Sequence, residues 1–177
     1  MFVVLLVVLL LAGVGFWLSR KNKREAKRLG AKFYAPAKHL FGIQGLKPKD
    51  VVYLFFADEQ LIMKAGKNTF NLNYEKLMAV EAVHKTDLVT KKKSVIGRGV
   101  VGGLAFGGVG AVVGALSAVG GEKAVKGDLL VLRYTSNDKN ETKTIIFDMI
   151  GKKQAKKCAQ YITERRPELA EPQVADL

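Results

Sequence analysis

The sequence has few of the residues that form disulfide bonds or bind metal ions in small domains. Its 177 residues contain one cysteine, Cys158, which excludes an intramolecular disulfide framework and whose helical position favours packing. The two histidines, His39 and His84, stand far apart, and no cysteine or carboxylate is spaced with them as a metal set. We find neither a nucleophile–base pair nor a Walker-type phosphate loop. The sequence therefore predicts a protein that is not an enzyme and holds neither a cofactor nor a metal.

Acidic residues are also scarce. There are 16 of them against 29 lysines and arginines, which gives a formal net charge of +13. Such an excess suggests an anionic partner, and nucleic acid or an anionic membrane leaflet would fit. Phe70 could stack on a base, but it alternates with Leu72, which favours core packing. We therefore expect membrane lipids of an anionic leaflet as partners and do not expect nucleic acid.

Charge is absent from the N-terminal stretch 2–18, which is apolar throughout and near the lower length limit for a spanning helix. The basic stretch SRKNKREAKR follows it directly. A cleaved signal peptide carries its positive charge before the apolar run, so we expect an uncleaved anchor instead. The positive-inside rule then predicts a single-pass protein of the inner (cytoplasmic) membrane, with its N-terminus outside and its soluble domain in the cytoplasm.

Charge is absent a second time from 99–121, where glycine recurs at helical spacing. Small residues four apart let helices approach closely, which favours a glycine zipper that associates with membrane or with itself. A single crossing would place the strands before and after it on opposite sides of a bilayer, so a hairpin with a turn near 106–110 is expected. A hydrophobic loop folded against the domain is the alternative. The G-x-G-x-x-G match at 97–102 lacks the preceding strand of a dinucleotide site.

Two sets of residues are therefore candidates for contacts. The self-association or membrane candidates are Gly99, Gly103, Gly107, Gly110 and Gly114. The basic candidates for lipid contact are Arg20, Lys21, Lys23, Arg24, Lys91, Lys92, Lys93 and Arg98.

The rest of the chain has the patterns of short strands and one helix. Strands are predicted at 51–57, 60–65, 69–73, 78–88, 129–135 and 142–148, with a turn rather than paired catalytic carboxylates at Asp58-Glu59. From Lys152 the period becomes helical, with one apolar face formed by Ala155, Cys158, Ala159 and Ile162. Pro167 is expected to end this helix.

The stretches KHLFGIQGL, ADEQLIMKAGKNTFNLNYEKL and IIFDMIGKKQAKKCAQYITER, together with the glycine segment, resemble bacterial pleckstrin-homology-like (PH-like) proteins of the GRAM or bacterial PH type. These are membrane-associated proteins with a glycine-zipper insert. The resemblance implies an α+β fold: an N-terminal transmembrane helix, a PH-like split β-barrel, a C-terminal helix that caps one open end, and an inserted glycine-rich helical hairpin. It implies a binding or scaffolding module and names no ligand.

The expected domains are a transmembrane anchor (1–19), a basic juxtamembrane linker (20–34), two parts of the PH-like domain (35–93 and 124–166), the glycine-zipper hairpin (94–123) and a tail (167–177). The expected function is that of a membrane-anchored, non-enzymatic scaffold or binding protein whose PH-like domain contacts membrane lipid or a protein partner. A homo-oligomer formed through the glycine segment is compatible with this function. The alternative is a glycine-zipper oligomeric pore or another membrane-perturbing effector.

Because the strands on both sides of the glycine segment belong to one sheet, we predict that the domain folds without it. A variant lacking residues 1–19, with 96–123 replaced by a short Gly/Ser linker, should be β-rich and should melt cooperatively. The entropy of loop closure changes by only about 0.6 kcal/mol per doubling of loop length. Circular dichroism measures the outcome, and an unfolded variant would show that the segment belongs to the core.

Overall fold

The computed structural model of the chain describes residue 4 and residues 20–84, 127–136 and 141–169. Residues 20–28 are helical. The strands and helices that follow are β1 (Phe33–Phe41), β2 (Val51–Phe56), β3 (Gln60–Ala65), β4 (Asn68–Asn73), the short 3-10 helix η1 (Tyr74–Lys76), β5 (Leu77–Val83), β6 (Leu129–Thr135), β7 (Thr142–Met149), α4 (Gln154–Thr163) and the 3-10 turn η3 (Pro167–Leu169).

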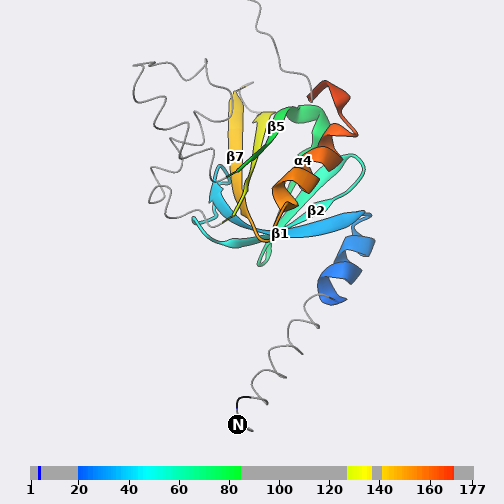
Figure 1. Cartoon of the computed structure of the whole chain (residues 1–177), viewed down its shortest axis with the longest axis vertical. Helices are drawn as coiled ribbons and strands as arrows, with labels where there is room; N and C mark the ends of the chain where they lie inside the picture. The colour runs from blue at the N-terminus through cyan, green and yellow to red at the C-terminus, as the bar shows by residue number, and fades with distance from the viewer. Residues whose placement is uncertain (1–3, 5–19, 85–126, 137–140, 170–177) are drawn as a thin grey trace, which may run out of the picture.

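The strands form one antiparallel sheet in the order β4-β3-β2-β1-β7-β6-β5. Two meanders, β1 to β4 and β5 to β7, are therefore joined by a single ladder between β1 and β7. The sheet curves around α4 (Figure 1), and α4 packs against β5 and β6. Its edge strands β4 and β5 do not pair with each other. The described domain is thus a split barrel with a helix across one opening, which confirms the expected α+β PH-like fold and its capping helix.

Strand β1 is central although it contains Pro36, a residue usually confined to sheet edges. It pairs with β2 from Phe33 to Lys38 and with β7 only from Ala37 onwards. The carbonyl of Pro36 accepts a hydrogen bond from the backbone of Ile150, just beyond the end of β7. The N–H and C=O groups of a strand residue point to the same side of the strand. The side on which Pro36 lacks an N–H therefore faces Ile150, which lies beyond the last residue of β7, and no hydrogen bond within the β1–β7 ladder is lost.

The apolar face of α4 fills one half of the barrel interior. Ala155, Cys158 and Ile162 are fully buried among the inward residues of the sheet, and Ala159 is partly buried beside them. The Tyr161 ring stacks edge-on against Phe33 and Phe56. The helical period of the sequence therefore predicted the packing of this helix correctly.

The end of α4 is held to the turn between β2 and β3. Arg165 lies 3.5 Å above the Tyr161 ring and donates a 3.0 Å hydrogen bond to Asp58. That hydrogen bond, more than the nearby Lys32, lowers the pKa of the Asp58 carboxyl. Arg166 donates to the carbonyl of Tyr74. Asp58 thus has a structural role in the turn, as expected. α4 ends at Thr163 with Glu164 as its C-cap, and Pro167 begins η3 three residues after this cap.

The basic segment before β1 is docked on the domain. Ala26 is buried against Phe55 and Ile62 on the outer face of β2 and β3. Glu25 accepts hydrogen bonds from Lys64 of β3 and from Arg28, which together lower the pKa of its carboxyl. Residues 20–28 therefore have a fixed orientation relative to the sheet.

The loop between β1 and β2 is built around the buried ring of His39. Its Nε2 accepts a 3.1 Å hydrogen bond from the backbone of Ile43, so Nδ1 carries the proton and donates to the carbonyl of Lys47 at 3.3 Å. Gly42 follows β1 with φ of +99°, and a Cβ there would lie 2.0 Å from the carbonyl oxygen of Thr144 in β7. The loop therefore crosses close to β7, and only glycine fits at position 42.

The predicted localisation, a single-pass protein of the inner membrane, is contradicted. In the described part of the chain, no helix is long and apolar enough to cross a membrane. The helix at 20–28 rises only about 14 Å at 1.5 Å per residue, against about 30 Å for a bilayer core. The run at 2–18, on which the prediction of an N-terminal transmembrane helix depended, lies outside the described residues except for Val4. The glycine segment and its predicted hairpin lie outside them as well.

We predict that His39→Ala lowers the free energy of unfolding by about 3 kcal/mol, because it removes a buried ring and leaves the Ile43 N–H without an acceptor. Lys47→Ala, at an exposed side chain in the same loop, should change it by less than about 0.5 kcal/mol. Urea unfolding followed by circular dichroism compares the two. Equal stabilities would show that the ring does not organise the loop.

Cys158 is fully buried, and burial raises the pKa of its thiol to about 12. We predict that the folded protein resists a thiol-exchange reagent at mildly alkaline pH, because neither thiolate nor access is available. Labelling should become stoichiometric in guanidinium. Rapid labelling of the folded chain would contradict the packing of α4.

Candidate functional site

The half of the barrel that α4 leaves unfilled contains a cavity of about 790 Å³. Strand register explains its walls. Met63 faces Phe70 across the β3–β4 ladder, and Leu72 lies two residues further along β4, so these three side chains share the inner face. On the opposite wall, Ile145 of β7 is nearly completely buried and also points inward. The cavity therefore continues the hydrophobic core into a space that no side chain of the described residues fills.

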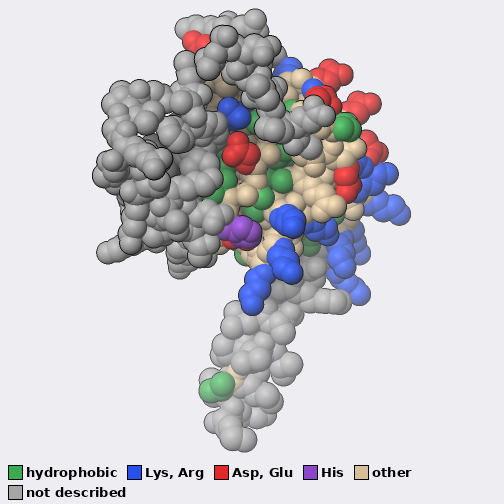
Figure 2. All heavy atoms as spheres, turned by 45° about the horizontal axis from the view of Figure 1, so that its top comes forward, with side chains coloured by type: hydrophobic (Ala, Val, Ile, Leu, Met, Phe, Trp, Pro, Cys, Tyr) green, Lys and Arg blue, Asp and Glu red, His purple; other side chains and the backbone are tan. Residues whose placement is uncertain are grey.

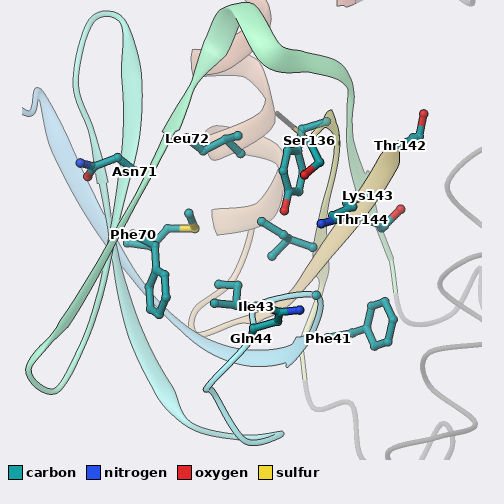
Figure 3. A pocket seen from close by; sticks show the side chains of 14 residues that line it. Phe41, Ile43, Gln44, Phe70, Asn71, Leu72, Ser136, Thr142, Lys143 and Thr144 are labelled. Carbon is teal, nitrogen blue, oxygen red and sulfur yellow. The ribbon is translucent and has the colours of Figure 1, made fainter. Parts of the chain in front are cut away.

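The floor and outer parts of the cavity are visible in Figure 3. Ile43, held by His39, and Gln44 approach from the β1–β2 loop, and Phe70 points into the hollow. Asn71, between two inward residues of β4, points away from it. The alternation predicted for residues 69–73 is thus confirmed, and it places Phe70 inside the barrel.

The mouth of the cavity lies at the β6–β7 hairpin. Tyr134 and Lys143 are directly opposite each other in the β6–β7 ladder. Lys143 is two residues from Ile145, so it shares the inward face of β7. Burial raises the pKa of the Tyr134 hydroxyl, which keeps it protonated and able to donate a hydrogen bond. Among the residues that line the cavity, Lys143 alone is charged, and none of the described salt bridges includes it.

A second feature is a basic face around the start of α4. We define it by five lysines, of which the last four lie within six positions along the chain: Lys38, Lys152, Lys153, Lys156 and Lys157. Lys38 and Lys152 line the same shallow depression of about 500 Å³, which Asp128 and Asp148 also line. Figure 2 shows lysine and arginine side chains gathered on one part of the described domain, whereas acidic side chains lie mostly towards the other end.

The start of α4 is unusual in its electrostatics. Lys153 is its N-cap, in the left-handed region at φ of 59°, and makes no side-chain capping hydrogen bond. No acidic residue lies in the first turn. Lys157 lies 4.9 Å from the centre of the Phe33 ring. Within the described residues, no salt bridge includes any lysine of the basic face.

The two ends of the segment 85–126 meet beside this face. Val83 of β5 pairs with Leu129 of β6, and His84 lies 2.9 Å from a carboxylate oxygen of Asp128. The buried carboxylate of Asp148 accepts a 2.8 Å hydrogen bond from the backbone of Gly127. In the portion of the chain that can be described, no group of three potential metal ligands occurs.

The structure describes only part of the predicted contact residues. Arg20, Lys21, Lys23 and Arg24 are exposed on the helix at 20–28. The glycines at 99, 103, 107, 110 and 114 and the basic residues at 91, 92, 93 and 98 lie outside the described residues. The lysines of the basic face were not among the predicted contact residues, although the run KKQAKK that supplies four of them was visible in the sequence. Nothing in the neighbouring sequence marked Lys143 as a candidate, because only the pairing of β6 with β7 places it at the cavity.

Comparison with known families supports the same fold. Residues 43–148 match the family described as glycine zipper containing PH domain. The match begins in the β1–β2 loop and ends in β7, so it covers most of the split barrel and the segment between β5 and β6. A search of curated proteins found no match. The match covers more than half of the chain, and the chain therefore belongs to the family of glycine zipper containing PH domains.

Proposed function

We propose that this chain is a non-enzymatic binding protein whose PH-like domain attaches to anionic lipid headgroups through the basic face. PH-like domains commonly bind lipids or proteins. The observation that carries the proposal is the set of lysines at the start of α4, which have no acidic partner among the described residues.

This arrangement works against the stability of the isolated helix. The N-terminus of a helix is its positive end and favours acidic side chains, yet the first turn of α4 has none and is flanked by the N-cap Lys153 and by Lys156 and Lys157. Lys157 follows the N-cap Lys153 by one turn, with its backbone N–H bonded to the Lys153 carbonyl, and like charges at this spacing repel each other. An anion beside the first turn would offset both costs. The basic face is thus electrostatically complementary to a dense anionic surface.

Lipid headgroups fit this face better than nucleic acid does. Lysines are flexible point charges that follow a layer of phosphates, whereas base recognition requires planar donors or exposed aromatic platforms. The aromatic residues that could have stacked on bases are engaged elsewhere: Phe55 is buried beneath the helix at 20–28, and Phe70 faces the cavity. The exposed basic side chains Lys23 and Arg24 would add to the attraction.

The test is sedimentation with vesicles of phosphatidylcholine containing phosphatidylglycerol, compared with pure phosphatidylcholine. We expect the protein to bind only the anionic vesicles, more weakly as salt increases. Lys153→Gln combined with Lys156→Gln should weaken binding roughly thirtyfold, at about 1 kcal/mol per lysine.

The matched control removes the same charge elsewhere, by Lys67→Gln combined with Lys76→Gln, and should bind nearly as the unmodified protein does. Equal loss in the two pairs would mean that only net charge matters. Binding that ignores headgroup charge would exclude the basic face as a lipid site, and a protein partner would then be the class to search for.

A further inference from the structure

The cavity combines an apolar interior with a single cation. Its walls are Met63, Phe70 and Leu72 on one side and Ile145 on the other, and Ile43 forms the floor. Its volume of about 790 Å³ lies within the range of small-molecule sites, which are lined mostly by apolar side chains with a few polar groups that fix orientation. The lining also includes the polar residues Gln44, Asn71, Ser136, Thr142, Lys143 and Thr144, so the apolar wall is where an apolar group would pack.

Lys143 indicates which chemical group the other end of the ligand should carry. It is half-buried on the inward face of β7, opposite Tyr134, and no described carboxylate pairs with it. An anionic group at the mouth would gain an attraction to this ammonium that no described carboxylate supplies. The Tyr134 hydroxyl can donate a hydrogen bond to the same anion. The ligand should therefore have one anionic end and one apolar body.

We propose that this cavity is a binding site for a single acyl chain with an anionic head, in which the chain lies between the β3–β4 and β6–β7 walls and the head contacts Lys143. Free fatty acids and one-chain anionic phospholipids share this chemistry. The cavity and the basic face have no residue in common, so the ligand of the cavity is independent of the proposed function.

The full chain is titrated with dansyl-labelled undecanoic acid, and the fluorescence gain on binding is measured. Saturated carboxylates from octanoate to stearate, below their micellar concentrations, then compete with the probe. We expect affinity to rise about fourfold per added methylene until the cavity is filled and to level off beyond that length. Lysophosphatidylglycerol is tested in the same way, and the tighter of the two ligand types identifies the source of the acyl chain.

Three variants test the geometry. Lys143→Gln should weaken carboxylate binding roughly tenfold and leave the uncharged methyl esters unchanged. Lys67→Gln, an exposed lysine outside the cavity, is the matched control. Ser136→Trp places a large ring at the mouth and should abolish binding of both acids and esters, while an unchanged melting temperature shows that the domain is intact.

Three results would overturn the proposal. One is an affinity that does not depend on chain length. Another is an equal effect of Lys143→Gln and Lys67→Gln. The third is full binding by a folded Ser136→Trp variant. Failure of these tests would leave the vesicle result unaffected, since the basic face is not altered by any of the variants.

Discussion

The ladder between β1 and β7 is the interaction on which the rest of the domain depends. It alone joins the two meanders into one sheet, and its register places Ala37 opposite Met149. The register of this ladder shifts between His39 and Phe41, just beyond the last residue that pairs with β2, and an irregularity of this kind bends a strand. The two meanders that the ladder joins supply the opposite walls of the cavity.

The two ends of the barrel interior are treated differently. At one end α4 supplies small and branched side chains that complete the core, and Arg165 and Arg166 fix its last turn. At the other end the β1–β2 loop, held by His39, covers the interior only partly, and the cavity remains. Among the described residues, one end of the barrel is thus packed to the density of a protein core and the other is hollow.

Much of the fold could be predicted from local pattern. The turn at Asp58-Glu59, the alternation of β4 and the apolar face of α4 depend on neighbours in sequence, and all three are confirmed. Strand β1 was not predicted, because Pro36 argues against a central strand until the length of β7 is known. The cavity could not be predicted either, since Lys143 and Phe70 are brought together only by long-range pairing.

At the junction between β5 and β6, the two ends of the segment 85–126 lie side by side. Val83 and Leu129 are ladder partners, and the His84–Asp128 contact closes the pair of ends at 2.9 Å. Because the segment leaves and re-enters the sheet at adjacent positions of the ladder, its length does not determine the register or direction of β5 and β6. Its length can change at a cost in closure entropy that grows only logarithmically. Closure entropy alone therefore puts little constraint on the length of the segment between β5 and β6.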